Sequence, residues 1–354
     1  MGSDSTTRRF LSSLLFIAFF LIGWAALQFK LDYVVLSPGP ALDVGPMISV
    51  KGAPDHSGGS LYLTTVYSDM DVHLGELVQA QIGGTGQVLP KKDVLPPTMS
   101  AADYSHLVLD MMEESKTVAR IVALQKLGYD VKASGEGARV EQLLPGNKAE
   151  GVLAQGDVVV GADGQQIQTA NDLVNLVRRQ KPGDQVALTV RRGTDSFDAV
   201  VGTKESDSEP GIAVVGIMIK TYNFGHNLPV QIDIDSENIG GPSAGLMFTL
   251  GIMDAMTAGG MTGGHKVAGT GTISLDGSVG PIGGVSQKVV GAEQSGAEYF
   301  LAPADNYEAA RQSAHRINVV RVGTVDDAIA FLKGLQPAHK ASLLSFPQVC
   351  QPAA

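Results

Sequence analysis

An uncharged stretch near the N-terminus restricts the folding of this chain more than any other feature. Residues 10–29 read FLSSLLFIAFFLIGWAALQF and contain no Asp, Glu, Lys or Arg. As a helix with a rise of about 1.5 Å per residue, the segment would be about 30 Å long, which is the thickness of a bilayer's hydrocarbon layer. Trp24 lies near the far end, where aromatic rings favour the membrane interface. We therefore expect residues 10–29 to form a transmembrane anchor.

The charges that flank this segment predict its orientation. Arg8 and Arg9 precede it, and only Lys30 follows closely. The positive-inside rule then places residues 1–9 in the cytoplasm and the rest of the chain outside the membrane. Two alternatives remain: a cleaved signal peptide, whose apolar core is normally about 7–15 residues long, and a buried helix of a soluble protein. The greater length of this segment favours an uncleaved anchor in the cell membrane.

Composition excludes several classes of function. A chain of 354 residues is long enough for about two domains of about 150 residues each. Its 26 Lys and Arg against 36 Asp and Glu give a net charge of -10, which argues against nucleic-acid binding, because phosphate contacts need clustered cations. The single cysteine, Cys350, excludes an intrachain disulfide and a cysteine-based metal site. The seven histidines form no ligand pair, so we expect no metal and no cofactor.

The chain beyond the anchor divides into segments of different character. Residues 30–128 are β-rich and include a helix over residues 100–127, with Ser100 as its N-cap and Gly128 as its end. We expect this region to pack with the unit that follows it, residues 129–205. Together with the anchor, these patterns predict an α+β multidomain protein.

Residues 129–205 show a specific order of strands, helix and turns. A strand over residues 138–144 ends at a Pro-Gly turn, a helix covers residues 169–180, and two strands close the unit at residues 186–191 and 197–201. With the strings GARVEQLLPGNKAEGVLAQGDVVVGADGQQIQTANDLVNLV and KPGDQVALTVRRG, this order resembles a bacterial PDZ domain.

The resemblance implies that the unit binds an extended peptide, often a free C-terminus, as an additional strand at a sheet edge. It places the receiving strand at about residues 137–143, with a nest for the terminal carboxylate near residues 134–137. The alternative is a PDZ-like spacer that binds nothing specific. The residues assigned to peptide binding are Gly137, Ala138, Arg139, Val140 and Glu141.

A Gly-Gly-Pro-Ser-Ala-Gly run over residues 240–245 carries the first candidate for chemistry. It follows an alternating strand over residues 230–235 and opens a helix that begins with Ser243. Backbone N–H groups at a helix start, here near Ala244, can stabilise an oxyanion. Gly241 lets a substrate backbone come close. Ser243 is therefore a candidate nucleophile.

A serine hydroxyl needs a base, and Lys288 is the best candidate. No histidine stands out, and His265 is interpreted as a turn residue. The helix after Gly284 places Lys288 on one face with Val285 and Ala292, and apolar surroundings lower the pKa of an amine so that it can accept a proton. The alternative is an ordinary lysine whose end reaches water.

The two motifs resemble the proteolytic domain of the Lon family, a Ser–Lys peptidase. The family pattern is Pro-Ser-Ala-Gly at the nucleophile and Gly-Gly-x-x-x-Lys at the base, and here Ser243 and Lys288 lie 45 positions apart. The resemblance covers residues 206–336. It implies that Thr270, in a Thr-Gly hairpin, supports the catalytic lysine. The remaining residues, 337–354, are expected to be a C-terminal tail.

The combination of anchor, PDZ unit and Lon-type unit resembles the membrane-bound, ATP-independent PDZ–Lon proteins of bacteria, the YlbL-like group. No Gly-x-x-x-x-Gly-Lys-Ser/Thr motif occurs in the sequence. The resemblance implies a serine endopeptidase that cuts flexible or misfolded segments outside the membrane, selected by the PDZ unit and held along the strand at residues 230–235. It also implies a hexamer. The alternatives are a PDZ scaffold with a silent peptidase unit and another Ser–Lys hydrolase, such as an amidase or a signal-peptidase-like enzyme.

Overall fold

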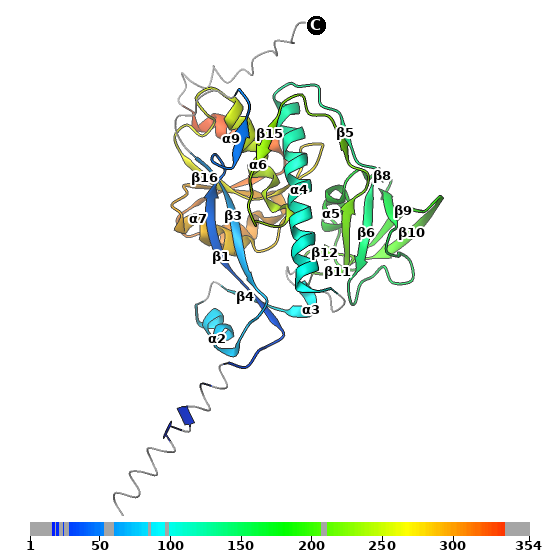
Figure 1. Ribbon diagram of the computed structural model, residues 1–354, viewed down its shortest axis with the longest axis vertical. Helices are drawn as coiled ribbons and strands as arrows, with labels where there is room; N and C mark the ends of the chain where they lie inside the picture. The colour runs from blue at the N-terminus through cyan, green and yellow to red at the C-terminus, as the bar shows by residue number, and fades with distance from the viewer. Residues whose placement is uncertain are drawn as a thin grey trace, which may run out of the picture.

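The computed structural model describes residues 16–17, 19–20, 24, 28–52, 60–83, 86–95, 99–206 and 211–336 (Figure 1). The expected anchor, residues 10–29, lies largely outside this part of the chain, and the expected tail, residues 337–354, lies wholly outside it. Within the part that is described, no helix has the length and apolar character needed to cross a membrane.

A six-stranded mixed sheet forms the larger unit, in the order β20-β19-β16-β3-β1-β4. Strand β16 pairs in parallel with both β3 and β19, whereas β1 is antiparallel to β3 and β4. The N-terminal strands therefore complete a sheet whose other half comes from the C-terminal third of the chain. The six strands are β1 (Tyr33–Asp43), β3 (Ser60–Asp69), β4 (Gln87–Pro90), β16 (Lys266–Gly269), β19 (Tyr299–Pro303) and β20 (Asn318–Val322).

Helices cover both faces of this sheet, because alternate strand residues point to opposite sides. Val267 and Leu301 join the core under α4, α6 and α9, while Ala268 and Phe300 join the core under α7 and α8. The result is a three-layer arrangement (Figure 1). The helices are α4 (Ala101–Lys126), α6 (Gly245–Met256), α7 (Val285–Gln294), α8 (Tyr307–Ser313) and α9 (Val325–Leu335).

The smaller unit has a sheet and a core of its own. Its strand order is β10-β9-β7-β6-β13, and helix α5 packs on the sheet through Leu173, Leu176 and Val177. Thr169 caps α5 in a capping box with Asp172. Its elements are β6 (Ala138–Leu143), β7 (Val158–Ala162), β8 (Gln165–Gln166), α5 (Ala170–Arg178), β9 (Gln185–Arg192), β10 (Asp195–Gly202) and β13 (Ile217–Thr221).

Strand β13 lies beyond the expected end of this unit at residue 205. A hairpin of β11 (Lys204–Glu205) and β12 (Ala213–Val214) returns the chain to the sheet, where β13 pairs antiparallel with β6. The unit is therefore longer than the sequence pattern indicates, because its last strand is separated from β10 by this hairpin.

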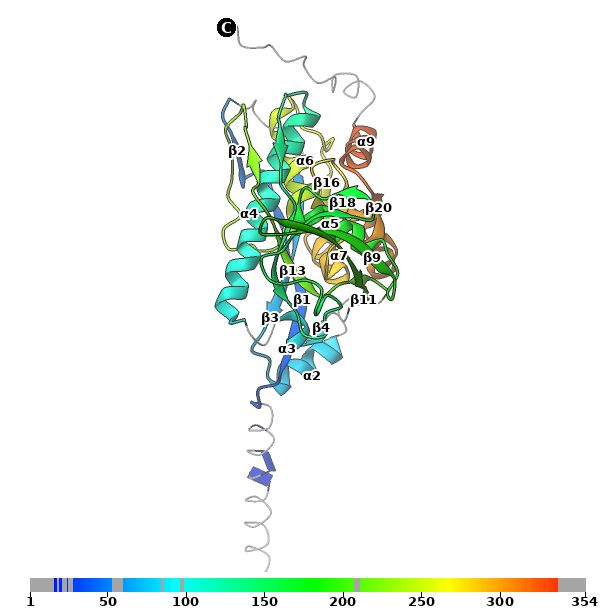
Figure 2. The ribbon, with the colours of Figure 1, turned by 90° about the vertical axis from the view of Figure 1, so that its right-hand side faces the viewer.

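Helix α4 lies between the two sheets in Figure 1 and runs along the left side of the molecule in the view of Figure 2. Its Ser100 cap accepts a hydrogen bond from the Asp103 N–H, as predicted. Asp110 forms an ion pair with Lys220 of β13 at 2.8 Å, and Glu114 accepts a hydrogen bond from the Thr221 hydroxyl. Residues 30–128 thus contact the smaller unit through α4, although their strands belong to the larger sheet.

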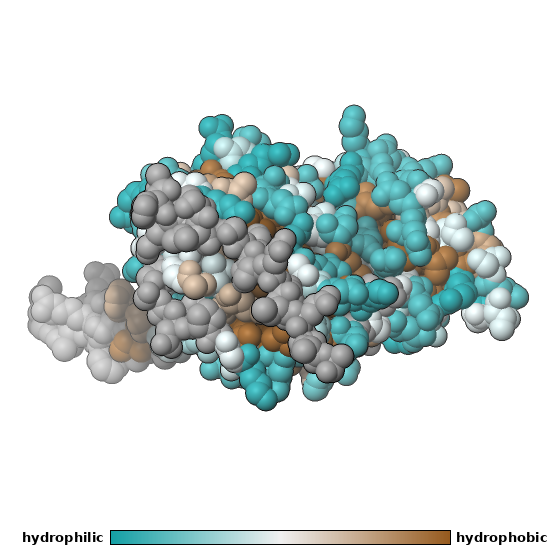
Figure 3. Space-filling model, turned by 90° about the horizontal axis from the view of Figure 1, so that it is seen from above, coloured by the Kyte–Doolittle hydropathy of each residue, from teal (hydrophilic) through white to brown (hydrophobic). Residues whose placement is uncertain are grey.

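The remaining elements are short. They are β2 (Ile48–Val50), α2 (Leu74–Gly83), α3 (Lys91–Val94), β5 (Ala133–Ser134), β14 (Gly225–His226), β15 (Ile232–Ile234), η1 (Pro242–Ala244), β17 (Thr272–Ile273), β18 (Val279–Gly280) and η2 (Ala304–Asn306). Figure 3 views the molecule from above and shows apolar side chains mainly in recesses between hydrophilic ones.

Candidate active site

Ser243 lies in a tight turn held by the long helix α4. The turn is η1, which leads directly into α6, and Gly241 precedes it with a φ of 90°. This left-handed conformation suits glycine because it has no Cβ. The Gly241 N–H donates to the Val108 carbonyl at 2.7 Å, and the Ser115 hydroxyl donates to the Pro242 carbonyl at 3.0 Å. Two residues of α4 therefore fix the backbone on which Ser243 is carried.

Lys288 lies on the first turns of α7 and points at Ser243. Its Nζ is 2.7 Å from Ser243 Oγ and 3.0 Å from Thr270 Oγ1. The lysine is 3% exposed, and burial lowers its pKa to about 7. An amine with this pKa is neutral in about half of the molecules at neutral pH and can then accept a proton.

Thr270 fixes the direction of the hydrogen bonds at this site. Its hydroxyl donates to the Ser243 carbonyl at 3.0 Å, so the same oxygen can only accept from Lys288 Nζ. A neutral amine that donates to Thr270 retains its lone pair for the Ser243 hydroxyl. The Gly271 N–H also donates to the Ser243 carbonyl, at 2.9 Å. The three side chains thus form an ordered relay.

A cavity of about 630 Å³ opens at this relay. Its walls come from both units and from α4 and are largely apolar. Six of the lining residues are Leu89, Val108, Met111, Val174, Ile219 and Ile282. An extended peptide with apolar side chains could therefore reach the Ser243 hydroxyl.

Glu114 and Ser115 of α4 are functional candidates that the sequence did not reveal. Glu114 lines the cavity, and burial raises the pKa of its carboxyl group. Both of its oxygens accept from Thr221, one from the hydroxyl and one from the N–H. The sequence predicts the helix, but no local motif indicates that it passes beside residues more than 100 positions later.

The structure brings Ser243, Lys288, Thr270 and Gly241 together, and Ala244 follows Ser243 in η1 as a buried residue. His265 lies elsewhere: its Nδ1 is 2.8 Å from Glu298 Oε2. No histidine among the described residues lines the cavity.

The predicted peptide-binding strand is wrong. Residues 137–143 correspond to β6, which pairs with β7 on one side and with β13 on the other. Gly137 is engaged too, because its carbonyl accepts from the Tyr222 N–H at 2.8 Å. Ala138, Arg139 and Val140 therefore have backbone partners on both sides, and the edge of β6 that would receive a peptide is occupied by β13; Glu141 lies at the irregularity in this pairing.

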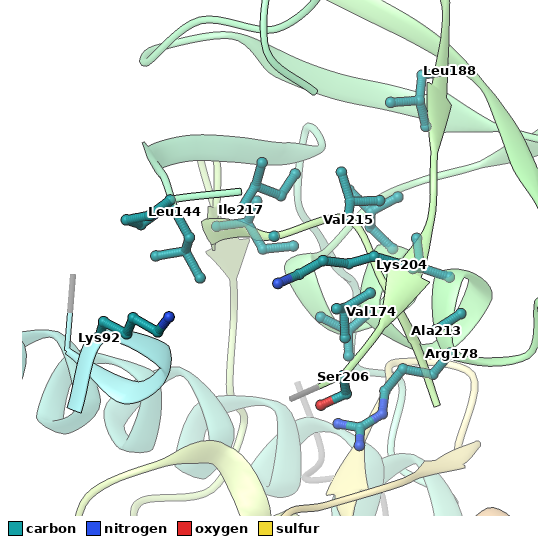
Figure 4. A pocket seen from close by; sticks show the side chains of 16 residues that line it. Lys92, Leu144, Val174, Arg178, Leu188, Lys204, Ser206, Ala213, Val215 and Ile217 are labelled. Carbon is teal, nitrogen blue, oxygen red and sulfur yellow. The ribbon is translucent and has the colours of Figure 1, made fainter. Parts of the chain in front are cut away.

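The edge strand of this sheet is β13, and a groove of about 230 Å³ separates it from α5. The groove has apolar walls that include Leu144, Val174, Val177, Leu188, Val215 and Ile217. Figure 4 shows the ammonium ends of Lys92 and Lys204 reaching into the space between these walls. The features expected of β6 are thus found on a strand that lies about 80 positions later in the sequence.

The strand expected at residues 230–235 is present, with one edge paired, and its role in holding a substrate stays a prediction. It forms β15, which pairs with β2, and the Ile234 carbonyl accepts from Lys116 of α4 at 3.2 Å. None of its residues lines the cavity at Ser243. The walls of the cavity at Ser243 come from other elements.

Comparisons with known proteins also distinguish two domains in this chain. The family model of the Lon protease (S16) C-terminal proteolytic domain matches residues 222–332, and that of the PDZ domain matches residues 125–202. Lon protease 2 of Bacillus subtilis is 35% identical over 124 residues, which cover 33% of this chain and 20% of that protein. Lon protease of Clostridium beijerinckii is 33% identical over 123 residues, covering 33% of this chain and 15% of that protein.

A third relative is a protease of another name. A probable periplasmic serine endoprotease DegP-like of Hahella chejuensis is 28% identical over 145 residues, covering 37% of this chain and 31% of that protein. The chain thus spans less than a third of the length of each of these three relatives. It joins a PDZ domain to a proteolytic domain of the Lon (S16) protease family.

Proposed function

We propose that this protein is an ATP-independent serine endopeptidase in which Ser243 and Lys288 form the catalytic dyad. The observation that carries the proposal is the 2.7 Å separation of Lys288 Nζ and Ser243 Oγ, with the lysine buried and its pKa lowered to about 7. A nucleophile and a base within hydrogen-bond distance are the signature of covalent catalysis.

In the first half-reaction Ser243 Oγ attacks the scissile carbonyl carbon while its proton passes to Lys288 Nζ. The backbone N–H groups of Ser243 and Ala244, at the start of η1, are the donors proposed for the oxyanion. The Lys288 ammonium then gives its proton to the leaving amine, and an ester to Ser243 remains. Thr270 keeps the amine directed at Ser243 throughout.

In the second half-reaction a water molecule replaces the amine that has left. Neutral Lys288 takes a proton from this water, and the hydroxyl oxygen attacks the ester carbon. Collapse of the second tetrahedral intermediate breaks the bond to Ser243 Oγ, which recovers its proton from Lys288. The carboxylic product leaves, and the dyad returns to its starting state.

We propose that the PDZ domain selects flexible or misfolded protein segments and that no nucleic acid takes part. The absence of a phosphate-binding Gly-rich motif in the sequence supports cleavage without ATP. The largely apolar cavity at Ser243 suits chains that are already extended.

We further propose a single-pass anchor at residues 10–29, with the catalytic domain outside the cytoplasm. The five described apolar residues Phe16, Ile17, Phe19, Phe20 and Trp24 are each more than half exposed, which supports a segment that the rest of the protein does not cover. Assembly into a hexamer is proposed on family resemblance alone.

The proposal is tested with Ser243→Ala in the full chain, using unfolded casein as the substrate. We expect cleavage to fall at least about 10³-fold, because the nucleophile is lost. Ser236→Ala is the matched control, since Ser236 is buried but does not line the cavity. A Ser243→Ala protein that cleaves as fast as the parent would show that the Ser–Lys mechanism is wrong, and a parent that binds but never cuts would favour the silent scaffold.

A further inference from the structure

Two asparagine side chains of the PDZ helix α5 lie buried against the proteolytic domain. Asn171 and Asn175 are 8% and 5% exposed, and their spacing of four residues puts them on one side of the helix. The residues of α5 that pack on the sheet of its own domain are different ones, Leu173, Leu176 and Val177. The two amides therefore belong to the interface between the domains.

Both amides donate hydrogen bonds to the hairpin of β17 and β18. Asn171 Nδ2 donates to the Ile273 carbonyl at 3.0 Å. Asn175 Nδ2 donates to Ser274 Oγ, also at 3.0 Å. The helix and the hairpin are in close contact, because a Cβ atom at Gly280 would lie only 1.9 Å from Asn175 Oδ1. Buried hydrogen bonds of this kind fix the position of the hairpin relative to the helix.

The segment that receives these bonds also holds the dyad. Two residues before Ile273, the Gly271 N–H donates to the Ser243 carbonyl at 2.9 Å. The preceding residue is Thr270, whose hydroxyl donates to the Ser243 carbonyl and accepts from Lys288 Nζ. A displacement of β17 would therefore change the positions of the nucleophile and the base together.

The start of α5 is connected to the nucleophile by a second route, through α4. The Ala170 N–H donates to the Thr221 hydroxyl oxygen at 2.9 Å, and this hydroxyl donates to Glu114 of α4. The next residue of α4, Ser115, donates to the Pro242 carbonyl at 3.0 Å. The two routes reach the turn η1 from different elements, so α5 supports it from both.

We propose that Asn171 and Asn175 are positioning residues for the peptidase reaction, which hold β17 so that Thr270 and Lys288 stay aligned with Ser243. The inference rests on the proposed peptidase function. It makes the PDZ helix part of the catalytic unit, whether or not the domain has a peptide bound. The reactivity of the Ser243 hydroxyl toward a small reagent should therefore depend on the two asparagines, because small misplacements of reacting groups are costly.

The first measurement is the rate at which a small fluorophosphonate labels Ser243, with the full chain in detergent. Asn171 lines the cavity, and a reagent of this size keeps peptide contacts out of the readout. We expect Asn171→Leu to lower the rate about tenfold. Asn147→Leu is the matched control, because Asn147 Nδ2 donates to the Leu144 carbonyl at 2.7 Å within the PDZ domain. Its rate should stay within about twofold of the parent, even where its melting temperature falls as far. An unchanged rate in Asn171→Leu, or an equal loss in the control, overturns the positioning role.

The second measurement uses the other contact and approaches it from both domains. Neither Asn175 nor Ser274 lines the cavity, so their variants do not remove a substrate contact. Asn175→Leu and Ser274→Ala should each lower kcat for casein about threefold to fivefold, with KM unchanged. The double variant should lose no more than the larger single loss, because both changes remove one contact. Losses that multiply, or that fall on KM alone, overturn the inference, and this holds even if Asn171→Leu fails to fold.

Deuterium exchange separates this inference from the peptidase function, because it needs no catalysis. We expect the amides of residues 268–276 to exchange about fivefold faster in Asn171→Leu than in the parent and in Asn147→Leu. If the parent cuts casein while labelling and exchange are unchanged in Asn171→Leu, the inference is wrong and the peptidase function stands. If the parent neither cuts nor is labelled while exchange is faster in Asn171→Leu, the peptidase function is wrong, and only the hold of α5 on the hairpin stands.

Discussion

Two regions of the molecule each bury a lysine almost completely, but the two amines have different neighbours. In the dyad region (Ser243, Thr270 and Lys288), the amine contacts two hydroxyl oxygens and no carboxylate of the described chain. In the β15 region, Lys116 forms an ion pair with Glu113 and donates to the Ile234 carbonyl. The two lysines are 3% and 5% exposed. The two buried amines thus differ in whether a carboxylate lies beside them, and burial without a counter-charge is what lowers the pKa of Lys288.

The difference between the two lysines is tested most strongly by replacing each of them and measuring cleavage. Lys288→Met should lower kcat/KM for a flexible substrate at least about 10³-fold, because Ser243 loses its base. Lys116→Met should change it less than about fivefold, since its contacts lie outside the cavity. Comparable losses in both variants would mean that the two lysines have the same kind of role.

Stability should respond in opposite directions. Lys288→Met should raise the free energy of unfolding by about 2–4 kcal/mol at pH 7, because the folded protein no longer buries an amine whose pKa is lowered to about 7 from 10.5. Lys116→Met should lower it by about 1–3 kcal/mol, since the Ile234 carbonyl loses its donor.

Urea unfolding over a range of pH sharpens the stability comparison. Between pH 7 and 10.5 the unfolded chain retains the lysine proton and the folded chain does not, so the parent gains stability as pH rises through this window. The advantage of Lys288→Met should therefore shrink toward pH 10.5. A pH-independent difference would show that the amine is not buried in a neutral form.

Thr270→Val tests the ordering of the relay with a smaller expected effect. Removing the hydroxyl leaves Lys288 without one of its two oxygen contacts, and we expect kcat to fall about 10- to 50-fold with little change in KM. Thr249→Val is the matched control, because the buried Thr249 hydroxyl donates to the Gly245 carbonyl within its own helix. Equal loss in the two variants would indicate a packing defect in place of a lost hydrogen bond.

The smallest effect is expected from pH. Catalysis requires the neutral Lys288 amine, so kcat/KM should rise about tenfold from pH 6 to pH 8, with a midpoint at about 7. Replacing Lys116 should leave this midpoint unchanged. A profile that is flat over the range would contradict a base with a lowered pKa.

The sequence was most informative where the determining contacts are local. Ser243 at a helix start and Lys288 beside a Gly-Gly turn are both encoded within a few neighbouring residues, and their spacing predicted a pair that the structure brings to 2.7 Å. The Ser100 cap and the helix that follows it were predicted for the same reason.

Non-local pairing was the part that could not be predicted. The strand at residues 138–143 has the alternation of a receiving strand, but only the fold shows that β13 covers its edge. The strand at residues 230–235 has a similar pattern and pairs with β2, which lies at residues 48–50. Likewise, nothing around Glu114 or Ser115 indicates the cavity, because its other walls come from distant parts of the chain.

The parallel pair of β3 and β16 has a consequence for the time at which this molecule becomes active. The Thr64 hydroxyl donates to the Gly269 carbonyl across 205 positions, so the pairing of β3 with β16 can form only after residue 269 has been synthesised. Until then β3 is paired only with β1, and Thr270 and Lys288, which follow β16, are not in place beside Ser243. The proposed peptidase therefore has no assembled dyad while its own chain is still being synthesised.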